Sequence, residues 1–379
     1  MTEPSTAIQD WLYTCIRCGN CKYIFKDYRQ SCPSGAYFHF ESFFASGRLW
    51  IAHGIQKGEL EWDNSLLDSI FACTTCSSCE IQCLAPHREH IVDIIEELRA
   101  LAVDALGPLE AHRKFTEKIT TNHNPYGHEH HNRRLLRELE LPETAPVVYF
   151  VGCTSNYREH AIRDATISIL KKAGVAFTIV DEYCCSSPLI RTGQLNQVRA
   201  LAEHNRAAFE TAGATKIVTS CAGCYRTLSK DYQRLGIQLN ADVIHISQFL
   251  RELIDDGKLK LEKTKELTEL TYHDPCHLSR HMNEYEAPRD VIERLPVHLT
   301  EMEFNRENSW CCGAGGGCKS AYSDWSLDTA RKRITHAKTM KVSTLVSACP
   351  FCKRALNDAN DGTLEIIDLS ELVDRLTLV

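Results

Sequence analysis

Cysteine placement constrains this chain more than any other feature of its sequence. The 379 residues include 19 cysteines, and all but one of them fall into two repeated patterns. The first pattern is a Cys-x-x-Cys-x-x-Cys triplet with an outlying fourth cysteine. It occurs twice, as Cys15, Cys18, Cys21 with Cys32, and as Cys73, Cys76, Cys79 with Cys83. Thiolates in this order are ligands for soft metals, above all for iron–sulfur clusters.

The second pattern follows residue 150 and also occurs twice. It consists of a lone cysteine, an adjacent Cys-Cys pair and a Cys-x-x-Cys motif. The copies are Cys153, Cys184, Cys185, Cys221 and Cys224, and then Cys276, Cys311, Cys312, Cys349 and Cys352. Equivalent cysteines lie 123 to 128 positions apart, which indicates an internal duplication. Cys318 lies outside both patterns and is expected to be an ordinary buried thiol.

Composition limits the compartment and the partners that we expect. A net charge of −7 gives no electrostatic footprint for nucleic acid. No apolar run is long enough to span a bilayer, and the first residues lack the basic and apolar regions of a signal peptide. We therefore expect a cytoplasmic protein, at most peripheral on the inner face of the membrane through a partner. In a reducing compartment, dense cysteine indicates metal binding instead of disulfides.

The pattern of apolar and polar residues changes near residue 146. Before it, residues 89–106 have the spacing of an amphipathic helix. After it, short apolar runs alternate with helical stretches. Strands are expected at 147–151, 176–180, 216–219 and 243–246, and again at 270–273, 297–302, 344–347 and 364–367. Several of these runs lead into the cysteines. In an open α/β sheet the carboxyl ends of strands form the ligand-binding edge.

The triplets favour cubane clusters over zinc. In two-cluster ferredoxins the fourth ligand of each cluster comes from the other motif. By that rule, Cys15, Cys18, Cys21 and Cys83 hold one [4Fe–4S] cubane, and Cys73, Cys76, Cys79 and Cys32 hold the other. Cys32 keeps the Cys-Pro ending, although the gap from Cys21 is ten residues instead of three. Zinc prefers two Cys-x-x-Cys pairs, which triplets fit poorly. Two fully ligated cubanes imply electron relay.

The five-cysteine pattern resembles the cysteine-rich domain of heterodisulfide reductase catalytic subunits. The same domain is shared with iron–sulfur subunits of glycolate, lactate and glycerol-3-phosphate dehydrogenases. The matching segments are 273–277 (HDPCH), 311–317 (CCGAGGG) and 349–352 (CPFC), with 152–154, 184–188 and 221–224 in the first copy. The first copy departs from the pattern at Ser186, where the family has a glycine, a residue with wider backbone freedom.

This resemblance covers essentially the whole chain and implies an architecture. It implies an α+β/α/β protein in which an α-helical dicluster ferredoxin domain precedes two duplicated α/β CCG modules. The expected boundaries are 1–105 for the two-cluster ferredoxin-like domain, 106–145 for a connector, 146–262 for the first module and 263–379 for the second. It also implies one noncubane [4Fe–4S] cluster in each module, held by the module's five cysteines.

Several other residues are candidates for roles around the clusters. Gly313, Gly315 and Gly316 lack the Lys-Ser/Thr ending of a P-loop, so we expect them to fold tightly around a cluster. His273, His277 and His281 flank Cys276, and His277 is the candidate proton donor to a product thiolate. Arg158 and Arg191 either meet an anionic substrate or neutralise cluster charge. The histidine-rich loop 123–131 is expected to be an ordinary polar loop.

The function implied by the family resemblance is disulfide reduction. Electrons would pass through the cubanes to the paired noncubane clusters, which the family uses to split a small-molecule disulfide. No Gly-x-Gly-x-x-Gly fingerprint is present, so we expect no nucleotide or flavin on this chain. The donor in a hetero-oligomer would be a flavoprotein or a membrane cytochrome b. Two alternatives stay open: an iron–sulfur relay component of a flavin-dependent dehydrogenase delivering electrons to quinone, or a scaffold with structural clusters.

Overall fold

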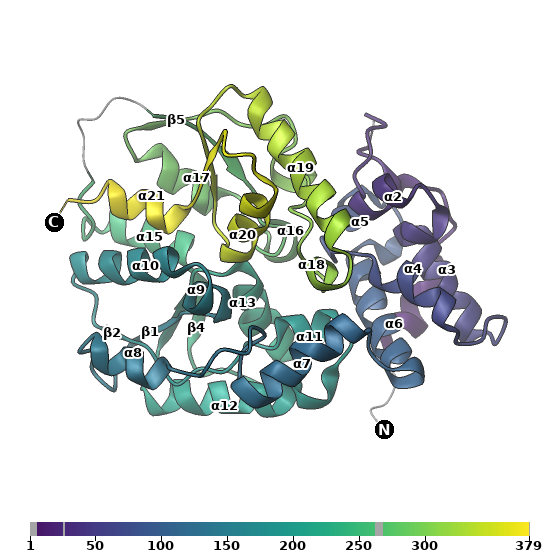
Figure 1. The fold of residues 1–379 in the computed structure, drawn as a ribbon, viewed down its shortest axis with the longest axis horizontal. Coiled ribbons are helices and arrows are strands. Elements are labelled where there is room, and N and C mark those ends of the chain that lie inside the picture. Colours follow the sequence, from purple (N-terminus) through teal and green to yellow (C-terminus); the bar gives the residue numbers. More distant parts are fainter. Residues whose placement is uncertain (1–5, 26, 262–267, 379) are drawn as a thin grey trace.

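Two parallel four-stranded sheets organise the part of the chain that follows residue 146. The computed structural model describes residues 6–25, 27–261 and 268–378. Figure 1 shows one sheet in the lower half and one in the upper half of the view, with the N-terminal helices forming a third body on the right. Among the described residues, no helix combines the length and the apolarity needed to cross a bilayer.

The N-terminal part is helical and is built around short turns that carry cysteines. Its helices, with the two helices of the connector that follows, are α1 (Thr6–Trp11), α2 (Pro33–Phe38), α3 (Ala45–Gln56), α4 (Leu67–Phe71), α5 (Ser78–Gln82), α6 (Ile91–Leu106), α7 (Glu110–Asn122) and α8 (Asn132–Glu138). The amphipathic helix expected at 89–106 is α6. Its apolar face, including Ile94, Ile95 and Leu98, packs in a hydrophobic core that belongs to the N-terminal part.

The first module alternates strands and helices, as its sequence pattern predicts. Its elements are β1 (Val147–Phe150), α9 (Cys153–Tyr157), α10 (His160–Lys172), β2 (Phe177–Thr178), α11 (Ser187–Arg191), α12 (Val198–Thr211), β3 (Lys216–Thr219), α13 (Ala222–Arg226), α14 (Tyr232–Arg234), β4 (Asp242–His245) and α15 (Ile246–Asp255). A π-helical turn over Thr227–Asp231 joins α13 to α14.

The second module repeats this order. Its elements are β5 (Thr268–His273), α16 (Ser279–Met282), α17 (Glu286–Glu293), β6 (Val297–Leu299), α18 (Cys318–Ala321), α19 (Ser323–Thr339), β7 (Thr344–Ser347), α20 (Pro350–Ala359), β8 (Glu365–Asp368) and α21 (Leu369–Arg375). The expectation of a mixed α/β protein is confirmed, with strand bounds within three residues of those predicted.

The duplication extends to strand order and register. The first sheet has the order β2-β1-β3-β4 and the second β6-β5-β7-β8, all parallel. Phe150 pairs with Thr219 in the first sheet, and His273 pairs with Ser347 in the second. One continuous hydrophobic core runs through both modules. The two sheets therefore have the same strand order and equivalent registers. The carboxyl ends of β1, β3, β5 and β7 each lead into a segment that contains cysteines.

Candidate iron–sulfur site and active site

The five thiols of each module form a chain of neighbours in the same order. In the first module hydrogen-bond contacts link Cys153 to Cys184, Cys184 to Cys185, Cys185 to Cys224 and Cys224 to Cys221. In the second they link Cys276 to Cys311, Cys311 to Cys312, Cys312 to Cys352 and Cys352 to Cys349. The duplication seen in the sequence thus becomes one spatial arrangement of sulfur atoms, present twice.

The two thiol chains meet each other. The thiol of Cys221 is in hydrogen-bond contact with that of Cys349, across the boundary between the modules. All ten cysteines except Cys311 line one cavity of about 780 Å³. The structure therefore places nine of the ten module cysteines, from both sets, on the wall of a single chamber.

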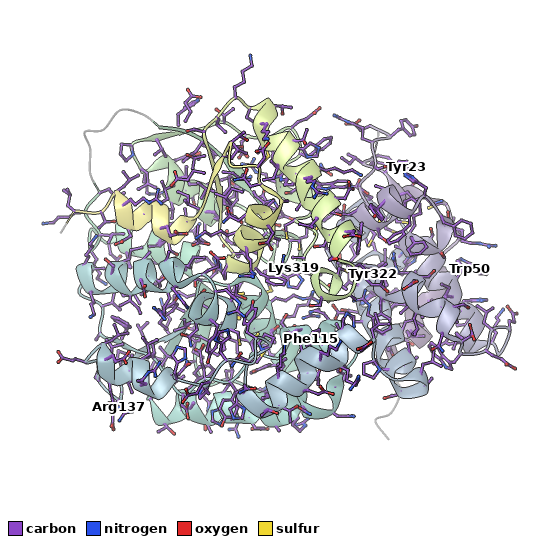
Figure 2. All side chains as sticks on the ribbon, in the orientation of Figure 1. Tyr23, Trp50, Phe115, Arg137, Lys319 and Tyr322 are labelled. Carbon is purple, nitrogen blue, oxygen red and sulfur yellow. The ribbon has the colours of Figure 1, made fainter. Side chains whose placement is uncertain are left out.

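The chamber lies where the two modules and the connector meet. Figure 2 labels three of its lining residues, Phe115 on α7 and Lys319 and Tyr322 on and beside α18. Lys114 and Lys118, also on α7, line it as well. The wall is mostly apolar, with lysines from α7 and α18. Asp68 and Glu110 line it too, and Lys114 pairs with Glu110 and Lys319 with Asp358, so charges of both signs border an apolar frame.

The N-terminal triplets share one backbone design. The second and fourth residues after the leading cysteine have positive φ in both copies: Arg17 and Gly19 in the first, Thr75 and Ser77 in the second. Left-handed backbone is costly for a β-branched residue such as Thr75. The carbonyl of Thr75 lies 2.7 Å from Nε2 of His281 on α16, so the second module supports the strained turn.

The outlying cysteines lie with the opposite triplets. Cys15, Cys18, Cys21 and Cys83 surround one small pocket. Cys32 instead lies close enough to Cys73 and Cys76 to interact electrostatically with both. Cys32 also raises the pKa of the Cys21 thiol, so the ligand sets of the two triplets stay a prediction. Burial raises the pKa of the Cys21 thiol to about 11, so a thiolate there at neutral pH depends on metal binding to displace the proton.

The triplets differ in what covers them. Cys18 is exposed, and Ile16 beside it is 79 % exposed. Cys76, the equivalent of Cys18, is buried in a cluster with Cys276 and Cys311 of the second module. The Cys76 and Cys311 thiols are hydrogen-bond neighbours. A continuous series of sulfur atoms therefore leads from the second triplet through the second module into the first.

The glycine run after Cys312 has two structural roles. The Gly313 N–H donates to the Cys311 sulfur at 3.3 Å, and its φ of +84° matches the +76° of Ser186 in the first module. The Gly expected at this position is thus replaced by a serine that adopts the same left-handed conformation. A Cβ on Gly315 would lie 2.6 Å from the Thr74 carbonyl oxygen, and one on Gly316 would lie 2.2 Å from that of Cys73.

Backbone N–H groups also point at sulfur in the triplets. The Thr75 N–H donates to Cys73 Sγ at 3.4 Å, and the Ala85 N–H donates to Cys83 Sγ at 3.4 Å. Hydrogen bonds of this kind stabilise ligand sulfur and tune cluster potential. Together with the number and order of the thiols, they fit iron–sulfur clusters at the triplets and in the modules.

His277 lines the chamber, whereas His273 and His281 do not. The His277 ring lies 4.9 Å from that of His281, centroid to centroid, and its Nε2 is buried without a hydrogen-bond partner among the described residues. Burial, with Arg226 and Arg191 nearby, holds its pKa well below the ordinary value. The resting ring is therefore neutral.

Arg191 lines the chamber, yet its charge is already balanced. Its guanidinium pairs with Glu96 on α6 at 2.5 Å and with Asp231 of the π-helical turn. Arg226 joins the same buried group through Glu96 at 3.3 Å. The π-helical turn, which sequence periodicity could not reveal, brings Asp231 to this position. Arg158 instead stacks over the ring of Tyr126 at 4.6 Å.

The connector loop contributes to the chamber, which the sequence did not predict. Tyr126 lines the cavity, and its hydroxyl lies 2.9 Å from the hydroxyl of Thr154, beside Cys153. His123 stacks on Tyr183, and its carbonyl oxygen accepts from the Cys184 N–H at 2.9 Å. Cys318 is a fully buried thiol, as expected.

Comparison with known families assigns the parts of the chain. Residues 147–229 and 270–357 match the family described as cysteine-rich domain, CCG, and residues 11–85 match the 4Fe-4S dicluster domain. The solved structure of a hypothetical protein from Helicobacter pylori is similar in fold, with a TM-score of 0.61 over 89 % of this chain and 68 % of that one, at 10 % identity.

Curated relatives agree with these domain matches. The chain is 37 % identical to one subunit of the dihydromethanophenazine:CoB–CoM heterodisulfide reductase of Methanosarcina acetivorans, over 98 % of this chain and 95 % of the relative. It is 35 % identical to one subunit of the fumarate reductase (CoM/CoB) of Methanothermobacter marburgensis, over 81 % of this chain and 61 % of that one. It is 31 % identical to EtfAB:quinone oxidoreductase of Syntrophomonas wolfei, over 81 % and 46 %. The chain therefore belongs to the family of iron–sulfur oxidoreductases that includes this heterodisulfide reductase subunit.

Proposed function

We propose that this chain is the disulfide-reducing subunit of a hetero-oligomeric complex. The observation that carries the proposal is the contact between Cys221 and Cys349, which joins two complete five-thiol sets on one chamber wall. A disulfide bound in the chamber would take up two electrons and two protons, its S–S bond would break, and two thiols would leave.

Four sets of cysteines are proposed as ligands, one set for each cluster. Cys15, Cys18, Cys21 and Cys83, and Cys73, Cys76, Cys79 and Cys32, would each hold a [4Fe–4S] cubane. Each five-cysteine set would hold a noncubane [4Fe–4S] cluster, with Gly313, Gly315 and Gly316 packed close to the second. Clusters held by these cysteines would store and pass single electrons. The protein would fix the order in which the four clusters follow one another.

Electrons would enter at the first triplet, because Cys18 and Ile16 are exposed there whereas Cys76, the equivalent of Cys18, is buried. The donor would be another subunit, either a flavoprotein or a membrane cytochrome b; the name of the Methanosarcina relative identifies that protein as one subunit of a larger enzyme. Lys118 of α7, which lines the chamber and forms no ion pair with another described residue, would orient an anionic small-molecule disulfide. His277 would supply a proton, because a thiolate formed beside its neutral ring raises the ring's pKa.

An anaerobic assay tests the proposal. Reduced methyl viologen would serve as donor, and a panel of anionic and neutral disulfides as acceptors. We expect two viologen radicals to be oxidised and two thiols to form per disulfide, with anionic acceptors preferred. Replacing His277 with Gln should slow the reaction, and more so at higher pH, where solvent protons are scarce. Unchanged rates at every pH would remove His277 from the mechanism.

A second candidate function is electron relay to quinone beside a flavoprotein. The similarity to EtfAB:quinone oxidoreductase favours it. Reduction of a quinone analogue without any viologen-driven thiol formation would support this candidate and contradict disulfide reduction.

A further inference from the structure

A buried histidine distinguishes the second module from the first. His273 is the last residue of β5, three residues before Cys276, and it is 1 % exposed. One of its ring nitrogens and the Sγ atoms of Cys312 and Cys352 all lie within 4.8 Å of one another. Such proximity leaves two roles open: a direct metal ligand, or an N–H donor to ligand sulfur.

Arg333 on α19 decides between these roles. Its Nε lies 3.0 Å from Nδ1 of His273. A guanidinium only donates hydrogen bonds, so Nδ1 must accept and must carry no proton. The proton of the neutral ring is therefore on Nε2. That nitrogen is buried and has no hydrogen-bond partner among the described residues. A protonated nitrogen cannot ligate a metal, but it can donate to sulfur.

Arg333 itself is a buried charge without a direct ion-pair partner, although Asp274 and Glu301 lie close enough to stabilise it electrostatically. Its other donors reach the Phe304 carbonyl at 2.7 Å and the Ser309 hydroxyl at 3.1 Å, and it forms no ion pair within the part of the chain that the structure describes. A buried cation is costly unless an anion compensates it. The His273 ring stands between this cation and the thiols. An anionic cluster at those thiols would supply the missing compensation.

The first module lacks both residues. The position equivalent to His273, by strand register and by spacing from the lone cysteine, is Phe150. The position equivalent to Arg333, counted back from the ends of α12 and α19, is Asn205. The first module instead has a buried carboxyl group, Glu182, which accepts from the Val151 and Gly152 N–H groups. The surroundings of the first module's thiols therefore stabilise added negative charge less than those of the second module's thiols.

Two other buried guanidinium groups place positive charge on the same side of the molecule as Arg333. Arg280 donates to the Cys76 carbonyl at 2.7 Å, and Arg99 donates to the Cys73 carbonyl at 2.7 Å. Neither forms an ion pair with any described residue, whereas Arg191 and Arg226, on the first module's side, are paired with carboxylates. Uncompensated positive charge therefore gathers around the second triplet and the second module.

We propose that His273, positioned by Arg333, donates its Nε2–H to the cluster sulfur ligands Cys312 and Cys352, and that this makes the second module's cluster the more readily reduced of the pair. The inference rests on the cluster proposed for that module, but not on disulfide turnover. The electron that arrives by way of Cys76 would then remain in the second module until the substrate is bound. His273 is a positioning residue, because it acts through the sulfur ligands.

The test compares three variants of the anaerobically prepared holoprotein by redox titration followed by EPR and Mössbauer spectroscopy. H273F copies Phe150 of the first module and removes the donor. H273Q keeps an N–H group near the same place. H336F is the control, since His336 packs on Phe304 and Trp310 in the same module. We expect H273F to lower the equilibrium constant for reducing one four-iron site about tenfold, which is 59 mV for one electron. H273Q should keep most of the equilibrium constant of the unmodified protein, and H336F should leave that constant unchanged.

A spectroscopic measurement on the unmodified protein guards against loss of the cluster in H273F. With ¹⁵N-histidine, pulsed ENDOR spectra of the reduced site should show coupling to a histidine nitrogen and to a proton that exchanges in D₂O. Absence of that coupling, or a shift of less than twofold in H273F with all iron retained, would overturn the inference. A normal shift in a protein that reduces no disulfide would contradict only the proposed function.

Discussion

The thiol of Cys221 at the end of β3 contacts the thiol of Cys349 at the end of β7, so two sheets related by duplication meet through the same cysteine of each. The contact joins equivalent positions, because Cys221 and Cys349 both open a Cys-x-x-Cys motif. A gene duplication has thus produced a symmetric pair of sites that face each other. The charged groups around the pair are not symmetric, and in the proposed function this asymmetry would give electron flow a direction.

Iron content should distinguish ligand cysteines from the one extra thiol. Replacing Cys83 with Ser removes the fourth member of the first pocket, so iron should fall from about sixteen to about twelve atoms per chain. Cys318→Ser is the matched control, since Cys318 is fully buried and its thiol points at the Phe71 and Gly316 carbonyls. It should keep all of the iron. Equal losses in both variants would contradict the ligand assignment.

Gly316 should not tolerate a side chain, because the Cys73 carbonyl oxygen occupies the space that a Cβ needs. Gly316→Ala should lower the free energy of unfolding by about 2 kcal/mol more than Gly174→Ala. Gly174 has nearly the same φ, +62° against +60°, but nothing lies within 4 Å of its Cβ position. Its substitution isolates the backbone strain, about 1 kcal/mol. Urea unfolding measures both, and similar losses would show that the junction is not tightly packed.

Glu96 should be essential for stability because it balances two buried guanidinium groups, Arg191 and Arg226. Glu96→Gln would leave one positive charge uncompensated, at a cost of about 3 kcal/mol in the free energy of unfolding. Glu117, whose pair with Arg113 is exposed, is the control. Glu117→Gln should cost less than about 0.5 kcal/mol. If the two variants unfold at the same urea concentration, the buried group does not hold the domains together.

His112 should make stability depend on pH. Burial lowers its pKa to about 4, and its Nε2–H donates to the Gly317 carbonyl oxygen. The unfolded chain therefore binds a proton near pH 6.5 that the folded chain does not, so stability falls as the pH drops below 6.5 and levels off near pH 4. Between pH 7.5 and 5.5 the unmodified protein should lose about 1.4 kcal/mol more than His112→Gln. Parallel pH profiles for the two proteins would contradict this role.

The sequence predicted the strands and the repeat because both depend on local patterns. β3 and β7 match the expected ranges residue for residue, since short apolar runs before a cysteine are buried-strand signals. The ligand sets that cross between the two triplets rest on a rule about spacing and stay a prediction. These inferences needed only the order of residues along the chain.

Contacts between distant segments could not be predicted in this way. Nothing near Gly315 or Gly316 in the sequence indicates that the loop of Cys73 packs on them. Three histidines around Cys276 looked equivalent, yet their rings go to different places: His277 to the chamber, His281 to Thr75, and His273 to Arg333 and the thiols. Only the three-dimensional arrangement separates them, because partners such as Thr75 and Arg333 lie 60 or more residues away in the chain.

The most direct test of the central claim counts iron and acid-labile sulfide in anaerobically purified protein and assigns the sites by Mössbauer spectroscopy. The account predicts about sixteen iron atoms and a matching amount of sulfide per chain, in four four-iron sites of which two are not ordinary cubanes. Protein that carries about eight iron atoms, with free thiols at Cys221 and Cys349, would show that the facing modules hold no clusters and would contradict it.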